Sequence, residues 1–186
     1  MCMFRDLIAD EIECRVAQAK ASGVSLLLYK DARCDQTILD ETVGEFGWQR
    51  THTRDNANCI VSLWDEKKQQ WISKEDTGTE SNTEKEKGLA SDSFKRACFN
   101  WGIGRELYTA PFIWIKSEYC TELKEYTDPR TREQKWKCFD SFEVQKIVIE
   151  NKRIVAIAIK NTKSGKTCFV WQDKKWEAEQ KVKSNA

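Results

Sequence analysis

The stretch EKEKGLASDSFKRACFNWGIGRELY, residues 84–108, gives the clearest indication of the fold. At the helical period of about 3.6 residues, one face of it collects small and apolar side chains: Ala90, Phe94, Ala97, Cys98 and Trp101. The spacing predicts a helix over residues 84–101 that buries this face in a core. Gly102 and Gly104 follow at once. We expect them to end the helix, because a phosphate-binding GxG loop precedes a helix instead of following one.

The opposite face of this predicted helix is polar except for one aromatic ring, and it presents Asp92, Lys95, Arg96 and Phe99. A Lys-Arg pair beside an aromatic side chain can bind a phosphate while the ring stacks on a base. The alternative is a solvated helix face on which Phe99 packs against a neighbouring subunit. Arg105, directly after the glycines, is a further candidate for a phosphate contact.

The residues before this helix predict two more helices and a three-stranded meander. Apolar residues recur at helical spacing over residues 4–21, and Ser22-Gly23 is a stop signal. A buried strand, a short helix and three meander strands are then predicted at residues 24–29, 36–43, 47–53, 58–64 and 70–75. Residues 77–84 (TGTESNTE) are polar without periodicity, which is typical of a mobile loop.

The residues after the helix predict mainly strands. These are expected at residues 112–116, 142–150, 153–160 and 167–171, with a polar loop through Asp128-Pro129. The order of elements predicts an α+β fold with a mostly antiparallel sheet, in which a β meander is followed by a basic helix and further C-terminal strands. We expect one domain over residues 1–172 and a charged, frayed tail over residues 173–186.

The charge of the chain is unevenly distributed. The 186 residues carry 31 Lys and Arg against 30 Asp and Glu, a formal net charge of +1. Residues 1–84 hold ten basic and sixteen acidic side chains, a balance of −6, whereas residues 85–186 hold twenty-one basic and fourteen acidic, a balance of +7. A basic half of this kind indicates either a polyanionic partner or solvated strand faces.

The apolar stretches and the cysteines predict a cytoplasmic protein. No apolar run is long enough to span a bilayer, and charged residues interrupt any early signal sequence. The eight cysteines are scattered and the chain has one histidine, so the usual zinc-ligand spacings are missing. The sequence therefore predicts buried, reduced thiols, with neither a metal site nor a cofactor.

Two sequence blocks resemble a known family. Residues 91–97 (SDSFKRA), with the following Trp101-Gly102-Ile103-Gly104-Arg105, resemble the signature of phage single-strand annealing proteins of the Rad fifty-two-like superfamily. Residues 39–44 (LDETVG), followed by Gly47-Trp48, are similar to the family's entry into its meander. The resemblance covers about residues 24–116. It implies a β-β-β-α core that assembles into a ring or a helical filament, with single-stranded DNA in a basic groove.

The resemblance also implies function and site residues. It implies single-stranded DNA binding and annealing of complementary strands in phage-type homologous recombination, without ATP and without an enzymatic step. The family's basic pair corresponds to Lys95 and Arg96, whereas a further basic position of eukaryotic members is Phe99 here. Further candidate DNA contacts are Arg105, Lys85, Lys87, Arg33 and Arg54. Expected partners are single-stranded DNA, copies of the chain itself, and a phage exonuclease or a host single-strand-binding protein, all in the cytoplasm of a bacterial host.

Two other functions remain open from the residues alone. A metal-dependent nuclease would draw on carboxylates that equally suit a solvated acidic surface: Asp31, Asp35, Asp40, Glu41, Glu45, Asp65, Glu75 and Asp76. A barrel-type protein that protects single strands without annealing them would use some of the eight Trp and eight Phe as stacking platforms. The long helix between the groups of strands fits a five-stranded barrel poorly. His52 lies in a predicted strand and shows no pattern of catalytic partners.

Overall fold

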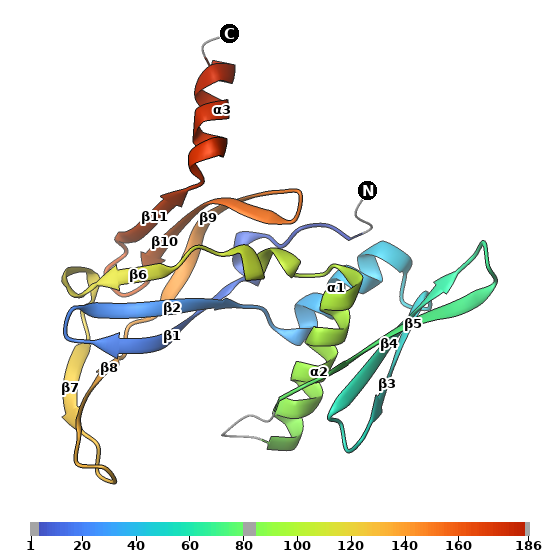
Figure 1. Ribbon diagram of the computed structural model, residues 1–186, viewed down its shortest axis with the longest axis horizontal. Coiled ribbons are helices and arrows are strands. Elements are labelled where there is room, and N and C mark those ends of the chain that lie inside the picture. The colour runs from blue at the N-terminus through green and yellow to red at the C-terminus, as the bar shows by residue number, and fades with distance from the viewer. Residues whose placement is uncertain (1–3, 80–84, 185–186) are drawn as a thin grey trace. The chain divides into compact units, whose positions relative to one another are not determined.

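The computed structural model describes residues 4–79 and 85–184, apart from the side chains of residues 85–87, 183 and 184. Within the range for which the sequence predicts one domain, the chain forms two compact units (Figure 1): Met1–Asp6 with Asp31–Arg105, and Leu7–Lys30 with Glu106–Ala186. Most of the segment predicted to be a mobile loop, residues 80–84, lies outside the described residues. None of the described helices is long and apolar enough to cross a membrane.

The first unit consists of two long helices and a three-stranded sheet. In chain order its elements are α1 (Ala32–Val43), β3 (Trp48–Thr53), β4 (Asn58–Asp65), β5 (Gln70–Thr77) and α2 (Lys85–Trp101). The strands form an antiparallel meander in the order β3-β4-β5, as the sequence predicts. The helix expected over residues 36–43 begins earlier, because the Asp31 carboxylate accepts a hydrogen bond from Arg33 N at 2.7 Å and caps the helix.

The core of the first unit lies between α2 and one face of the meander. Every second residue of β4 in this core is at most 4% exposed: Cys59, Val61 and Leu63. The predicted apolar face of α2 is confirmed by three side chains that expose no surface: Phe94, Ala97 and Cys98. Residues two apart on β4 thus pack against residues three and four apart on α2, and together they form one buried layer.

The second unit is built on a six-stranded sheet in the order β11-β10-β9-β1-β2-β6, and all its pairs are antiparallel. The strands are β1 (Glu13–Lys20), β2 (Gly23–Tyr29), β6 (Ile113–Lys116), β9 (Phe142–Glu150), β10 (Arg153–Asn161) and β11 (Thr167–Gln172). A hairpin, β7 (Leu123–Thr127) and β8 (Gln134–Cys138), and helix α3 (Lys174–Ser184) complete it. The described chain also contains 3-10 helices at Ala9–Glu11, Arg105–Thr109 and Ser117–Tyr119. The α+β class with mostly antiparallel sheets is confirmed.

The helix predicted over residues 4–21 is wrong, because this segment ends in strand β1. Its side chains alternate with a period of two until the register shifts between Val16 and Gln18. This β-bulge moves the next inward residue from position 18 to Ala19, so the pattern imitates helical spacing. Gly23, taken as a helix stop, instead begins β2 with φ 147°, where a Cβ atom would lie 2.1 Å from Ile115 O.

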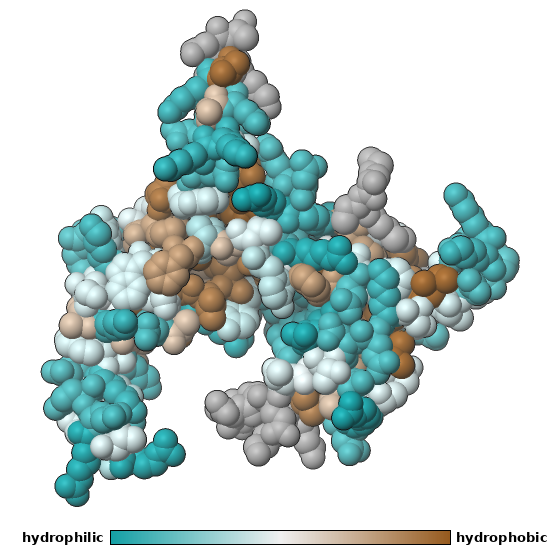
Figure 2. All heavy atoms as spheres, viewed as in Figure 1, coloured by the Kyte–Doolittle hydropathy of each residue, from teal (hydrophilic) through white to brown (hydrophobic). Residues whose placement is uncertain are grey.

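Two further segments differ from the sequence prediction. The polar loop expected around Asp128 contains the β7-β8 hairpin, whose outer end is hydrophilic (Figure 2) and therefore shows no apolar alternation. The tail expected to fray from residue 173 forms α3. Asp173 Oδ1 caps this helix by accepting hydrogen bonds from Lys175 N at 3.0 Å and Trp176 N at 3.2 Å.

Candidate nucleic-acid interface

Helix α2 is attached to the meander through aromatic side chains. Trp101 Nε1 donates a hydrogen bond to Val61 O at 3.0 Å, and the rings of Trp48 and Phe94 stack with centroids 6.0 Å apart. The guanidinium of Arg50, on β3, lies 4.7 Å from the Phe94 ring centroid. These contacts hold α2 on β3 and β4, so the outward face of the helix has a defined orientation.

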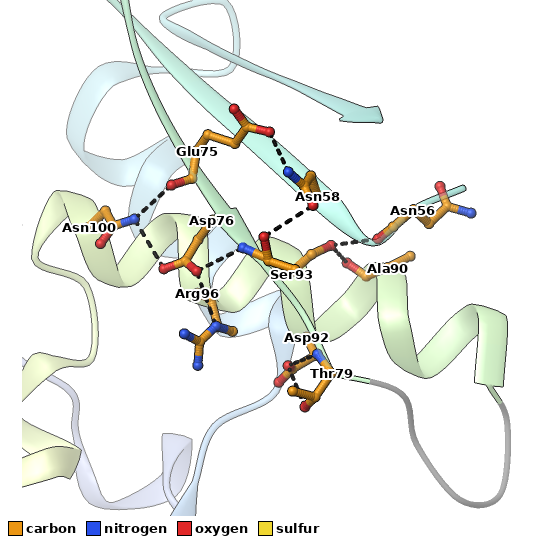
Figure 3. Close-up of polar contacts among 11 residues, drawn as sticks. Asn56, Asn58, Glu75, Asp76, Thr79, Ala90, Asp92, Ser93, Arg96 and Asn100 are labelled. Carbon is orange, nitrogen blue, oxygen red and sulfur yellow. Dashed lines mark hydrogen bonds and ion pairs between the residues drawn. The ribbon is translucent and has the colours of Figure 1, made fainter. Parts of the chain in front are cut away.

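A polar stripe with a spacing of four residues faces the end of β5 (Figure 3) and consists of Asp92, Arg96 and Asn100. Asp92 Oδ2 accepts hydrogen bonds from Thr79 N at 2.9 Å and from Thr79 Oγ1 at 3.2 Å. Asn100 Nδ2 donates to Glu75 O at 3.0 Å and to Asp76 Oδ2 at 3.2 Å. A solvated face is one of the two interpretations that the sequence leaves open for Asp92, whereas its carboxylate holds the chain that leaves β5.

Ser93 is a structural residue that the sequence analysis does not single out. It is fully buried, and its Oγ donates a hydrogen bond to Asn56 O, in the β3-β4 turn, at 3.0 Å and also lies 3.2 Å from Ala90 O. His52 Nδ1 lies 3.5 Å from the same hydroxyl. Burial, and secondarily the charge of Arg50, lower the pKa of His52. The spacing of Ser93 from Ala90 and Ala97, three and four residues away, was the available signal that it faces the core.

The predicted pair Lys95-Arg96 lies on the outer side of α2. Arg96 is 43% exposed in its side chain, and its Nε forms an ion pair with Asp76 Oδ1 at 3.2 Å. Its terminal nitrogens point away from Asp76 (Figure 3). Lys95 is partly exposed, and its charge contributes to lowering the pKa of Asp31 at the start of α1. The two adjacent cations therefore lie beside different neighbouring elements, β5 and α1.

Two cationic side chains donate hydrogen bonds to the last carbonyl groups of α2. Arg105 Nε donates to Phe99 O at 2.9 Å, and Arg105 Nη2 donates to Asn100 O at 2.9 Å. Lys74 Nζ, from β5, donates to the same Asn100 oxygen at 2.8 Å. Positive charge at a helix C-terminus is stabilised by the helix dipole. Gly102 confirms the predicted helix stop, with φ 100° and a hydrogen bond from its N to Phe99 O at 2.9 Å.

Phe99 is only partly exposed, because residues of its own chain cover it. The guanidinium of Arg105 lies 5.5 Å from the centroid of its ring. From the sequence, a neighbouring subunit or a DNA base is expected to cover this ring. In the structure, Arg105 of the same chain also lies against the ring. The part of the ring that stays exposed is therefore next to a positive charge.

The remaining candidate cations have different surroundings. Arg33 is 86% exposed in its side chain, and its Nη2 forms an ion pair with Asp31 Oδ2 at 2.7 Å. The charges of Arg33 and Lys95 both contribute to lowering the pKa of Asp31. Arg54 is exposed in the β3-β4 turn with φ 51°. The side chains of Lys85 and Lys87, in the first turn of α2, lie outside what the structure describes. Lys95, Arg96 and Arg105 therefore define the candidate interface, with Arg33 close to it.

Several carboxylates considered for a nuclease are buried or have structural partners of their own. Asp35 is fully buried, and Asp40 Oδ1 accepts a hydrogen bond from Trp48 Nε1 at 2.6 Å. Glu41 forms an ion pair with Arg5 at 2.7 Å. Within the described ranges, none of the carboxylates of the first unit belongs to a group of three side chains that could hold one metal ion.

Comparison with known proteins does not assign this chain to a family, since no family model, no curated protein and no solved structure matches it.

Proposed function

We propose that the first unit binds the backbone of single-stranded DNA without sequence preference and promotes the annealing of complementary strands without nucleotide hydrolysis. The observation that carries the proposal is the placement of Lys95, Arg96 and Arg105 on the outer side and at the end of one helix. The inner face of that helix is attached to a sheet, so the cations belong to a rigid support.

The chemistry of this face suits phosphates better than bases. Its charged groups are one ammonium and two guanidinium groups, which bind backbone oxygens without distinguishing base sequence. Contacts of this kind leave the base edges accessible to a second strand, which annealing requires. Phe99 adds a partly exposed ring beside Arg105, where a base or another protein surface can pack.

The order of elements in the first unit supports a Rad fifty-two-like core for this proposal. Three antiparallel strands precede a long helix that packs on them, and the helix carries the SDSFKRA block that resembles the annealing family. In this proposal the chain acts as a homo-oligomer, as a ring or a helical filament, and a phage exonuclease or a host single-strand-binding protein delivers or occupies the strand.

The small number of cations in each interface is a reason for the chain to act as an oligomer in this proposal. Three phosphate contacts would give a slope of about −2 in log K against log salt, since a single-stranded site contributes about −0.7 for each phosphate. Such a site is weak alone. Linking several sites on one strand converts later contacts into intramolecular ones and raises the overall affinity.

The proposal is tested by fluorescence anisotropy with two labelled single strands of equal length and unrelated sequence. We expect both to bind with similar affinity and a negative salt slope. The double variant Lys95→Ala/Arg96→Ala should weaken both about ten-fold or more and make the slope shallower by about 1.4 for each subunit. The control Lys146→Ala removes an exposed cation of β9 in the second unit and should change little. An affinity independent of salt, or equal losses in variant and control, would contradict the proposal.

A further inference from the structure

Three metal-ligating side chains converge in the second unit, well away in sequence from α2. The Sγ atoms of Cys120 and Cys138 and a carboxylate oxygen of Asp140 all lie within 4.8 Å of one another. Cys120 follows the 3-10 helix Ser117–Tyr119, Cys138 is the last residue of β8, and Asp140 lies just before β9. The sequence spacings typical of metal ligands do not reveal this group, because the β7-β8 hairpin separates the two cysteines in the chain.

The carboxylate in this group is held by its surroundings. Asp140 is 7% exposed, and its Oδ2 accepts hydrogen bonds from Thr121 N and Glu122 N, each at 2.9 Å. Its Oδ1 accepts a further hydrogen bond from Thr121 Oγ1. Carboxylates that bind metals are usually oriented by hydrogen bonds of this kind, which fix the ligand before the ion arrives.

The thiols are held close to the carboxylate. Cys138 Sγ donates to Asp140 Oδ2 at 3.3 Å, and Cys120 Sγ lies 3.7 Å from Lys116 O. The fully buried Asn161 donates from Nδ2 to Tyr119 O at 3.0 Å and fixes the backbone just before Cys120. Both thiols are only partly buried, which leaves an ion a path to them.

We propose that Cys120, Cys138 and Asp140 form a binding site for one thiophilic divalent metal ion of the Zn²⁺ class. Two sulfur ligands and one carboxylate match the preferences of Zn²⁺, whereas Mg²⁺ and Ca²⁺ take oxygen ligands. Tetrahedral coordination with Zn–S distances of about 2.3 Å places two sulfurs about 3.8 Å apart, so small side-chain rotations suffice. A water molecule completes the fourth position.

The consequence of this site is a crosslink at the base of the β7-β8 hairpin. The ion joins Cys138 at the end of β8, Cys120 in the segment that leads into β7, and Asp140 at the entry to β9, which are otherwise linked through hydrogen bonds to Asp140. Because the ion binds the folded site in preference to the unfolded chain, it should raise the melting temperature of the protein in proportion to the logarithm of the metal concentration. No feature of the proposed DNA interface enters this inference.

The site is tested on the full chain, kept reduced with a phosphine and freed of metal. Titration with Co²⁺ should produce a thiolate-to-metal charge-transfer absorption that saturates at one ion per chain, and Zn²⁺ should abolish it by displacement. Cys120→Ser and Cys138→Ser should each remove at least most of the band, since serine keeps a hydroxyl near Asp140 but lacks the sulfur. Cys34→Ser, a partly buried thiol of α1, is the matched control and should keep it.

X-ray absorption of the Zn²⁺-loaded wild-type chain gives the answer if a variant fails to fold. Two sulfur neighbours per zinc would support the site, and a shell of nitrogen and oxygen alone would overturn it. The proposal is also overturned if no band forms, if the band survives in both serine variants, or if Cys34→Ser removes it. After removal of the phosphine, formation of a Cys120–Cys138 disulfide in a chain that takes up no metal would overturn the proposal as well and would assign the pair to redox chemistry.

Discussion

Arg96 Nε lies 3.2 Å from Asp76 Oδ1, so the guanidinium that we propose to bind DNA is already paired with a carboxylate of β5. The two side chains are 43% and 23% exposed, and an accessible pair of this kind contributes about 1 kcal/mol or less. A DNA phosphate can therefore compete for Arg96 at small cost. In the proposed interface, Asp76 orients the guanidinium and reduces its attraction for a bound strand.

Asp76→Asn should increase the affinity for single-stranded DNA about two- to five-fold, which is the range that a pair worth up to about 1 kcal/mol allows. The single amide oxygen can accept from Asn100 Nδ2 or from Thr77 N, so the substitution also removes one of these two hydrogen bonds. Glu75→Gln is the matched control, because it removes the same charge from the preceding residue, whose side chain accepts a hydrogen bond from Asn58. Equal gains in the two variants, measured by anisotropy at one salt concentration, would show a general charge effect and not the release of Arg96.

Ser93→Ala should destabilise the first unit by about 1–2 kcal/mol, because it removes the donor that joins α2 to the Asn56 carbonyl in the β3-β4 turn. Ser91→Ala, two residues earlier and only partly buried, should have a smaller effect. Urea unfolding followed by tryptophan fluorescence measures both. A midpoint for Ser93→Ala that matches that of Ser91→Ala would contradict the role given to this hydroxyl.

Asp31 should titrate below its ordinary pKa of 3.8, mainly because the Arg33 side chain and backbone donate hydrogen bonds to it. A lowered pKa in the folded state means that the ionised carboxylate stabilises the fold above the unfolded pKa, and that this stabilisation is lost as the pH falls through the folded pKa. Carbon-detected NMR titration measures the pKa of Asp31. Arg33→Ala should raise this pKa toward 3.8, whereas Arg54→Ala should leave it unchanged. An Asp31 pKa that stays the same in Arg33→Ala would contradict the role given to Arg33.

Phe99→Ala distinguishes two uses of the partly exposed ring beside Arg105. If the ring packs between subunits, which we favour, light scattering should show smaller particles, and DNA binding should weaken through lost multivalency. If the ring stacks on a base, particle size should stay constant while affinity falls. Phe46→Ala is the control, because Phe46 is 92% exposed in the same unit. Unchanged size together with unchanged affinity would exclude both uses.

The fold of the first unit was largely predictable because its signals are local. The apolar spacing of α2, the glycines after it and the alternation in the meander each depend on neighbouring residues. The turn between β3 and β4 follows the same logic, since Asp55 and Asn56 adopt the left-handed conformation with φ 52° and 70°. Strand β1 was mistaken for a helix because its bulge breaks the period of two. The β7-β8 hairpin was missed because its outer end is polar and its strands show little apolar alternation.

The candidate sites were predictable only in part. Helical phase correctly places Lys95 and Arg96 on the outer side of α2. It cannot show that Asp76 lies next to Arg96, because helical phase does not identify the neighbouring strand. Helical phase also does not predict that the Arg105 side chain donates hydrogen bonds to the last carbonyl groups of α2, because Arg105 follows the end of the helix. The approach of Cys120 to Cys138 depends on the hairpin between them.

The most direct test of the central claim is the rate at which two complementary single strands pair, followed by fluorescence energy transfer between labels, without ATP. The account predicts that the wild-type chain accelerates pairing above the spontaneous rate. Lys95→Ala/Arg96→Ala should return the rate close to the spontaneous one, and Lys146→Ala should not. A wild-type chain that binds both strands but leaves their pairing rate unchanged, or slows it, would contradict annealing and identify a protein that protects single strands.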